Sequence, residues 1–397
     1  MPRLTVVVPT FQEAANLPQL VHRVHDVLSR ESIDYEMIVV DDNSPDETRQ
    51  ICQELAEKFP LRLIVRTAER GLSSAVVAGM NSATGELLVC MDADLSHPPE
   101  AIPELVAALE NPQTDFVIGS RYVRGGSTED GWGLLRWLNS KSATLLARPL
   151  TAVRDPMAGF FGLRSSAFQS AENLNPIGYK IGLELLVKCN CQCVKEIPIR
   201  FANRLYGDSK LSIREQLCYL RHLRRLYRFR FGVKAKAVEY GLVGLSGACA
   251  DLCVLWGLMQ VLPFNGARPL AICSAVVWNF WLNRDFTFED GRSKQVHLQF
   301  FRFVVACLSG ATVNWLISMG LQTNVPAFER NPLLAAVVGI SAGAGMNFAM
   351  CLRFVFRPIA NARSSVDSSA IRTHGSITHP RATVLDEPVT HLDQRIG

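Results

Sequence analysis

Four long apolar segments in the second half of the chain constrain its fold more than any other feature. They cover roughly residues 238–261, 269–288, 300–322 and 332–356. Each is close to the ~20 residues that an α-helix needs to cross the hydrocarbon core of a bilayer. Four such segments in succession favour membrane spans over buried core helices. The sequence therefore predicts a four-helix, all-α transmembrane domain over residues 237–357.

The membrane segments contain an internal repeat. Residues 240–251 resemble residues 303–314, and residues 279–288 resemble residues 347–356. The repeat predicts two copies of one helix pair. Glycines that would let the helices pack closely occur in both copies: Gly244, Gly247, Gly339, Gly343 and Gly345. Asp251 lies inside the first span, so it is a candidate for pairing or function.

Charge around the spans indicates their orientation. Basic residues precede the first span, separate the second from the third and follow the fourth: Lys234, Lys236, Arg284, Arg292, Lys294, Arg302, Arg353, Arg357 and Arg363. The positive-inside rule then places both termini and the N-terminal half in the cytoplasm, at the plasma membrane if the cell is prokaryotic. We expect an integral, multi-pass membrane protein.

A basic stretch leads into the membrane segments. Residues 200–236 hold eleven Lys or Arg against Asp208 and Glu215. This charge favours an anionic bilayer face, and no aromatic stacking platform accompanies it, so no nucleic-acid partner is expected. Residues 213–236 are interpreted as basic amphipathic interface helices. The polar tail over 358–397 is predicted to be disordered.

The N-terminal half, residues 1–212, alternates strands with helices. Strands are predicted over residues 4–8, 36–40, 61–66 and 87–91, and helices over residues 17–29, 46–59 and 74–83. This alternation predicts an α/β domain with a mainly parallel sheet. Ligands bind beyond the carboxyl ends of strands in such sheets.

Three of the predicted strands end in polar clusters, at residues 10–13, 41–46 and 92–94. In the last cluster, Asp92-Ala93-Asp94 follows a buried apolar run, so two carboxylates one residue apart can reach one divalent ion. Oxygen ligands of this kind suit Mg²⁺ or Mn²⁺, which often also hold substrate phosphates. Neither the glycine-rich dinucleotide fingerprint nor the P-loop motif is found, which argues against a dehydrogenase and a P-loop NTPase.

Together these residues resemble inverting, metal-dependent family 2 glycosyltransferases of the GT-A fold, and more closely their polyprenyl-phosphate branch, the dolichol-phosphate mannose synthases. The matching segments are VVPTFQE (7–13), VVDDNSPD (39–46), RGLSSA (70–75), MDADLSHPP (91–99), IGSRY (118–122), DPMAGFF (155–161), GYKI (178–181) and GDSKL (207–211). The membrane half resembles the GtrA-like family, which is linked to polyprenyl-linked sugars.

The resemblance implies a role for each matched residue. Those expected to line the nucleotide base and ribose are Pro9, Phe11, Glu13 and Asp42. Those expected at the metal and the donor diphosphate are Asp92, Ala93, Asp94 and Ser96, with Ser96 standing where some relatives have a Gln metal ligand. The expected phosphate-binding cations are Arg121, Arg204 and Lys210. Asp155 and Lys180 would shape the sugar and acceptor end. The catalytic candidates are thus Asp92, Asp94, Arg121 and Lys180.

Several of these residues also have a purely structural interpretation. Asp42 could be a turn residue, Asp46 a helix cap, Arg121 half of a structural ion pair, and Lys180 a surface lysine. His97, which precedes two prolines, is interpreted as structural rather than catalytic.

The reaction that the resemblance implies is transfer of mannose from GDP-mannose to dolichyl or another polyprenyl monophosphate. Two alternatives stay open. One is the same reaction with UDP-glucose or another nucleotide sugar. The other is a non-catalytic protein that translocates sugar-linked lipids and keeps a vestigial nucleotide-binding domain.

Overall fold

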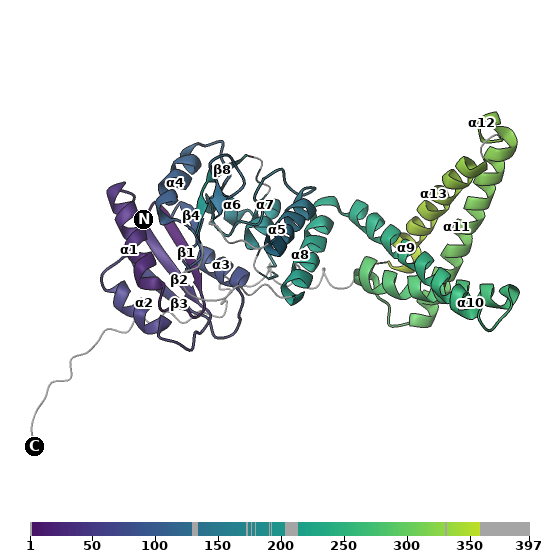
Figure 1. Cartoon of the computed structure of the whole chain (residues 1–397), viewed down its shortest axis with the longest axis horizontal. Helices are drawn as coiled ribbons and strands as arrows, with labels where there is room; N and C mark the ends of the chain where they lie inside the picture. Colours follow the sequence, from purple (N-terminus) through teal and green to yellow (C-terminus); the bar gives the residue numbers. More distant parts are fainter. Residues whose placement is uncertain are drawn as a thin grey trace, which may run out of the picture. The chain divides into compact units, whose positions relative to one another are not determined.

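The computed structural model of the chain describes residues 2–128, 134–171, 174–175, 177–178, 180–189, 191, 193–202, 213–329 and 332–357. The chain divides into two compact units, one ending at Arg230 and one beginning at Phe231 (Figure 1). The predicted tail over 358–397 lies outside the described residues.

The first unit is built on a seven-stranded sheet of order β3-β2-β1-β4-β7-β5-β8. Its strands are β1 (Leu4–Thr10), β2 (Tyr35–Asp41), β3 (Leu61–Val65), β4 (Leu87–Cys90), β5 (Phe116–Ser120), β7 (Phe161–Arg164) and β8 (Val194–Pro198). Only β7 runs antiparallel to its neighbours β4 and β5; the other pairs are parallel. The predicted α/β class and mainly parallel sheet are confirmed. Two short strands, β6 (Ser127–Thr128) and β9 (Arg200–Phe201), pair separately.

Helices lie between these strands. They are α1 (Leu17–Arg30), α2 (Thr48–Ala56), α3 (Leu72–Asn81), the short η1 (Pro99–Ala101), α4 (Ile102–Glu110), α5 (Leu134–Ala147), α6 (Ser165–Gln169), α7 (Ile181–Lys188) and α8 (Ile213–Phe231). The four predicted strands and the three predicted helices all occur, with ends that differ by a few residues.

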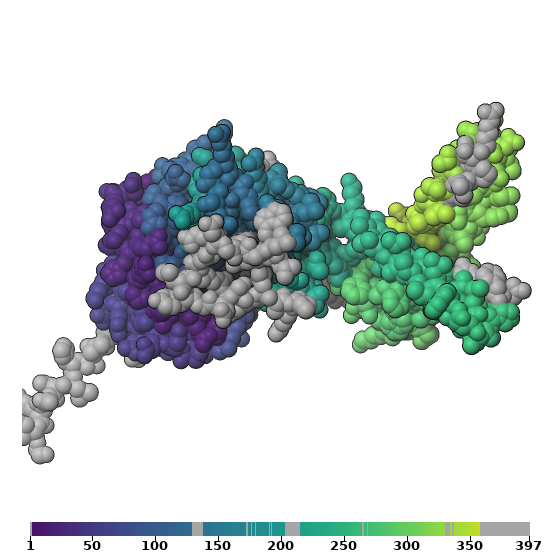
Figure 2. All heavy atoms as spheres, viewed as in Figure 1, coloured from purple at the N-terminus to yellow at the C-terminus, as the bar shows by residue number. Residues whose placement is uncertain are grey.

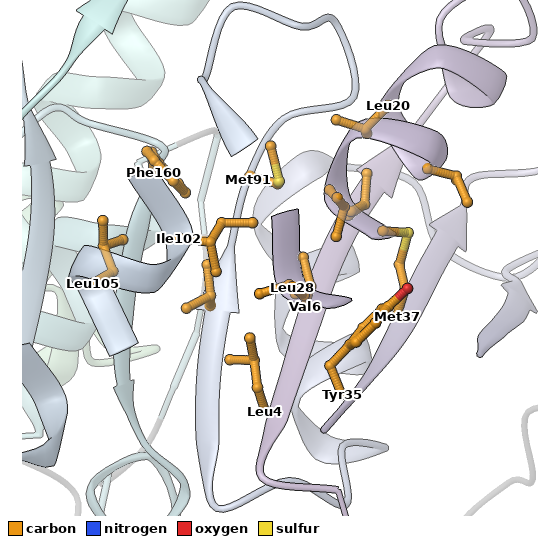
Figure 3. Packing of buried hydrophobic residues seen from close by; sticks show 14 of the residues in the cluster. Leu4, Val6, Leu20, Leu28, Tyr35, Met37, Met91, Ile102, Leu105 and Phe160 are labelled. Atoms are coloured by element: carbon orange, nitrogen blue, oxygen red, sulfur yellow. The ribbon is translucent and has the colours of Figure 1, made fainter. Parts of the chain in front are cut away.

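The two faces of the sheet bury separate apolar clusters, because successive side chains of a strand point to opposite faces. On β1, Val6 joins one cluster and Val7 the other. Figure 3 shows the first cluster, in which Leu20 on α1 and Ile102 on α4 pack over Val6 and Met37 of the sheet. This packing fixes the strands, and so fixes where their carboxyl ends lie.

Helix α8 differs in part from its sequence interpretation as an interface helix. Tyr219, Leu223 and Leu226 are buried in a cluster with residues of α5 and α7. One apolar face therefore packs against the first unit. Leu217 and Leu220 remain about half exposed on another face. Gly232, at φ +51°, separates α8 from the next helix.

The second unit is helical, as predicted. Its helices are α9 (Val233–Leu258), α10 (Phe264–Leu282), η2 (Asn283–Thr287), η3 (Glu289–Gly291), α11 (Val296–Asn324), α12 (Pro326–Glu329), α13 (Pro332–Met350) and η4 (Cys351–Val355). Within the described residues, three stretches are long and apolar enough to cross a membrane: Val233–Leu258, Val296–Asn324 and Val337–Val355. Helix α10, which corresponds to the second predicted span, is not among them and contains Pro269.

The surface of the second unit is apolar, as a membrane domain requires. Its helices, green to yellow in Figure 2, carry large apolar side chains that are more than half exposed, among them Leu245, Trp256, Leu308 and Trp315. Patches of this extent are uncommon on soluble monomers and mark an interaction surface. Lipid chains would cover them in a bilayer.

The internal repeat is visible in the structure. The second helix of each pair ends in a five-residue π-helical turn, η2 in the first copy and η4 in the second. In each copy a glycine of the first helix makes room for an asparagine of the second: a Cβ on Gly247 would meet the Asn279 side chain, and one on Gly310 would meet Asn347. The repeat-equivalent rings of Phe288 and Phe356 stack on each other, with centroids 4.8 Å apart.

Candidate active site

The carboxyl ends of β1, β2 and β4 lie at one edge of the sheet. The strand order reverses between β1 and β4, and open α/β sheets bind ligands in the crevice outside such a reversal. Asp42 N–H donates to the Thr10 carbonyl at 3.1 Å, and Met91 N–H donates to the Val7 carbonyl at 3.1 Å. The three polar clusters that the sequence singled out are thus brought together.

Asp42 holds the segment that follows β3. Its Oδ1 accepts a hydrogen bond from Arg66 Nε at 2.7 Å, and its Oδ2 accepts the Gly71 N–H at 2.6 Å. The carboxylate and the guanidinium are each about one-tenth exposed. Gly71 has φ +142°, a conformation that favours glycine. Arg66 also donates to Ser74 Oγ. Asp42 is therefore more than a turn residue, because it joins the loops after β2 and β3.

The other residues predicted at the nucleotide base lie on or just after β1. Pro9 is buried within the strand, and Phe11 and Glu13 are half-buried. The Arg70 guanidinium lies over the Phe11 ring, 5.6 Å from its centroid. Glu13 Oε2 accepts a hydrogen bond from Asn16 Nδ2 at 2.6 Å. These contacts place an aromatic face, a cation and a carboxylate on one side of the crevice.

Asp46 is structural. Its Oδ1 accepts the backbone N–H of Thr48 at 3.2 Å and the Thr48 hydroxyl at 2.6 Å. Its Oδ2 accepts the Ala14 N–H at 3.4 Å. Because Thr48 begins α2, Asp46 binds the first N–H of this helix from the residue before its N-cap, Glu47.

Asp92 stands where β4 ends. Its backbone N–H donates to His97 Nδ1 at 3.0 Å, whereas its carboxylate Oδ2 lies 3.9 Å from that nitrogen. The side chain of Asp92 is 29% exposed, in contrast to the buried His97 ring. Burial lowers the pKa of His97, which favours the neutral ring that this acceptor role requires.

Asp94 and Ser96 form a buried pair on the same loop. Asp94 Oδ1 accepts hydrogen bonds from the Ser96 hydroxyl at 2.6 Å and from the Ser96 N–H at 3.1 Å. Ser96 is fully buried and Asp94 is 5% exposed. The Ser96 hydroxyl proton is thus directed at Asp94, so Ser96 orients this carboxylate.

Arg121 and Asp155 form a bidentate ion pair. Arg121 Nε donates to Oδ2 at 2.8 Å and Nη2 donates to Oδ1 at 2.7 Å. Asp155 is fully buried. Burial is the largest single effect and lowers the pKa of Arg121, but the hydrogen bond and the charge of Asp155, together with Tyr122 and Asp92, raise that pKa overall. The ion pair considered for Arg121 is therefore present, and it places a permanent cation 5.3 Å from the Phe201 ring centroid.

Lys180 lies just before α7 and is not a surface lysine. Its Nζ donates to the Met157 carbonyl at 3.0 Å. Burial, followed by the repulsion of Arg121, lowers the pKa of Lys180 to about 8; Asp155 and Asp92 act in the opposite direction. Lys180 is thus electrostatically coupled to the groups at the ends of β4 and β5.

Some predicted site residues cannot be placed, and some that matter were missed. Arg204 and Lys210 lie outside the described residues. Arg66 was missed, although a basic residue at the end of a predicted strand is a signal that could have found it. Glu196 was missed without any such signal. Its carboxylate accepts the N–H groups of Arg154 and Asp155 and so supports the acidic partner of Arg121.

The oxygen donors on the loop after β4 fit a divalent cation. Mg²⁺ is commonly held by one or two carboxylates, with substrate phosphates and water completing its shell. Asp92 and Asp94 supply that number, and Ser96 orients Asp94. No group of three or more His, Cys, Asp or Glu side chains converges within the described part of the chain. A cation held by Asp92 and Asp94 would take its remaining ligands from substrate phosphates and water.

Comparison with known proteins defines the class to which this fold and site belong. The family described as "Glycosyl transferase family 2" matches residues 5–171, and the "GtrA/DPMS, transmembrane domain" matches residues 239–358. The chain is therefore a membrane protein with a family 2 glycosyltransferase domain of the GT-A fold.

Individual relatives narrow the class. The chain is 40% identical to dolichol-phosphate mannosyltransferase of Pyrococcus furiosus, over 87% of this chain and 97% of the relative. It is 46% identical to the protein of the same name from Mycosarcoma maydis, over 58% and 81%. The chain belongs to the dolichol-phosphate mannosyltransferase family.

Among solved structures, glucosyl-3-phosphoglycerate synthase of Mycobacterium tuberculosis, with Mn²⁺, uridine diphosphate and phosphoglyceric acid, aligns at TM-score 0.44 and 19% identity, over 58% of this chain and 79% of its own.

Proposed function

We propose that this glycosyltransferase transfers mannose from GDP-mannose to a polyprenyl monophosphate such as dolichyl phosphate, with inversion at the sugar. The observation that carries the proposal is the arrangement of Asp92 and Asp94 at the end of β4, with the Arg121–Asp155 pair and Lys180 electrostatically coupled to it. A relative named dolichol-phosphate mannosyltransferase, matched over 97% of its length, supports mannose as the transferred sugar and a polyprenyl phosphate as the acceptor.

The donor nucleotide would bind along the edge of the sheet. Its base and ribose would lie against the side formed by Pro9, Phe11, Glu13 and Asp42. Asp92 and Asp94 would hold Mg²⁺ or Mn²⁺ together with the diphosphate. Such a cation stabilises the negative charge that develops on the leaving diphosphate. We assign one of two roles to Ser96: it orients the carboxylate of Asp94, or it is itself a ligand of the cation.

The acceptor needs positioning more than activation. The second pKa of a phosphate ester is about 6, so its oxygen is already ionised at neutral pH. That oxygen attacks C1 of mannose, the bond from C1 to the β-phosphate oxygen breaks, and GDP leaves with the electron pair. No proton is transferred. Fixed cations would hold the two phosphorylated partners in line, and we assign this role to Arg121, Lys180, Arg204 and Lys210.

The membrane unit would keep the acceptor lipid in the same bilayer. We propose that both termini and the first unit face the cytoplasm, because basic residues such as Lys236, Arg284, Arg302 and Arg353 gather on one set of loops and helix ends. Donor and acceptor phosphate would then meet at the cytoplasmic face of the membrane.

A donor panel tests the proposal. The purified full chain is given a short polyprenyl phosphate and labelled GDP-mannose, UDP-glucose or UDP-N-acetylglucosamine, with Mn²⁺. We expect a labelled lipid product from GDP-mannose alone. Product from a UDP-sugar would show that this sugar nucleotide, and not GDP-mannose, is the donor. No product from any donor would favour a non-catalytic role in lipid translocation.

A further inference from the structure

His97 is a buried polar residue of the loop that carries Asp92. Its ring is 2% exposed. It stacks on Phe160, with ring centroids 5.3 Å apart and planes at 19°, and it meets Phe201 edge-on at 5.5 Å. Phe160, directly before β7, and Phe201, in β9, thus fix the plane of the imidazole ring.

The fixed ring binds the backbone of Asp92. Strand β4 ends at Cys90, and the Asp92 N–H donates to His97 Nδ1 at 3.0 Å. The chain turns back through Leu95, which has φ +62°, a conformation that is uncommon for a non-glycine residue. Such a turn persists only where its surroundings determine it, and the bond to His97 is one such constraint.

The hydrogen bond to His97 involves the backbone N–H of Asp92 and not its carboxylate. Asp92 Oδ2 is 3.9 Å from Nδ1, beyond hydrogen-bond distance. The peptide of Asp92 is therefore held while its side chain stays partly exposed. Gly159 leaves the necessary room: a Cβ there would lie 3.3 Å from both Asp92 Oδ2 and His97 Cε1.

We propose that His97 is a positioning residue, which orients Asp92 toward the divalent cation and the donor diphosphate by accepting its backbone N–H. The inference rests on the proposed function, since it concerns the same cation. It goes beyond that function because it assigns to a buried histidine a role in affinity for the metal, distinct from packing alone.

Three substitutions separate positioning from packing. His97→Asn keeps an acceptor on the γ-carbon, where Nδ1 was, but loses the ring. His97→Leu keeps more apolar volume but has no acceptor. His97→Gln carries an acceptor one bond too far along the side chain. Mn²⁺ affinity of the full chain in the presence of GDP is measured by titration of the free-ion electron paramagnetic resonance signal, alongside thermal unfolding and kcat and KM for transfer.

We expect Mn²⁺ affinity to fall about tenfold or more in His97→Gln and His97→Leu, as for loss of other groups that orient metal ligands, and by less in His97→Asn. The order of melting temperatures would differ, because His97→Leu retains more packing. The inference is overturned if Mn²⁺ affinity follows melting temperature, or if all three variants bind Mn²⁺ like the wild type. Failure of the wild type to transfer from GDP-mannose would instead count against the proposed donor.

Discussion

The loops after β2 and β4 have similar sequences and different tasks. Both follow a buried strand and both carry two aspartates close to the strand end. After β2, the carboxylate of Asp42 binds donors of the segment after β3. The carboxylate of Asp46 binds Thr48 at the start of α2 and the N–H of Ala14 in the loop after β1. After β4, Asp94 is oriented by a residue of its own loop, and Asp92 is held through its backbone. The difference teaches that the donors that reach an acidic residue at a strand end decide whether it joins neighbouring loops or is held within its own loop.

The largest effect is expected at Asp94. Asp94→Ala removes one of the two carboxylates assigned to the cation. Because the cation stabilises the leaving group by several kcal/mol, the rate of transfer should fall on the order of 10³-fold. The assay uses labelled donor with added Mn²⁺, and circular dichroism checks that the chain folds. Asp46→Ala is the matched control from the loop after β2. Turnover retained in Asp94→Ala would contradict the assignment of the metal site.

Asp42 should show its effect first in stability. Asp42→Ala leaves the Arg66 guanidinium largely buried without its carboxylate, which typically costs about 3 kcal/mol. We expect a lower melting temperature and a higher KM for the donor, with a smaller change in kcat. Replacing Arg66 by Met in the same chain should recover part of the stability, because the uncompensated charge is gone. A melting temperature equal to that of the wild type in Asp42→Ala would show that the ion pair does not support the loops.

Lys180 should give the reaction an alkaline limit. Its pKa is lowered to about 8, chiefly by burial, so the ammonium is present below that pH and is lost above it. If the ammonium binds phosphate, kcat/KM should decline by about tenfold per pH unit above 8. The acceptor phosphate is fully ionised throughout this range. Lys180→Arg, which stays charged, should remove the decline. A pH profile that is unchanged in Lys180→Arg would exclude Lys180 as its cause.

The smallest effect is expected at Asp46. Asp46→Ala removes the acceptor for the first N–H of α2 and should cost about 1 kcal/mol of stability, the usual value for a lost cap. Transfer at a temperature well below unfolding should stay near the wild-type rate. A large loss of turnover in the folded variant would mean that the loop after β2 also takes part in the chemistry.

Local pattern was sufficient for most of the fold. Continuous β-branched runs such as residues 4–8 predicted the central strands, because a strand buried on both faces is apolar throughout. The antiparallel β7 was not anticipated, since its direction depends on which neighbours it meets. The structural role of Asp46 was among the alternatives that the sequence left open.

The sequence identified most residues of the candidate site but not the contacts between them. Asp92, Asp94, Arg121 and Lys180 were all identified from motifs. Ser96 and Asp155 were identified in the same way. That Ser96 bonds to Asp94 and Asp155 to Arg121 was not predicted, because these pairings depend on how loops fold over the sheet edge.

By itself the sequence determined the two-part organisation, the mainly parallel α/β class of the first unit, the helical repeat of the second and the acidic residues at the strand ends. These follow from short-range periodicity and from the length of apolar segments. Only the tertiary structure decided which carboxylate joins neighbouring loops and which is oriented within its own loop. It placed Arg66 against Asp42, and it brought His97 back to the Asp92 N–H. The physical reason is that the role of an ionisable or polar group is set by its burial and by donors that come from distant segments of the chain.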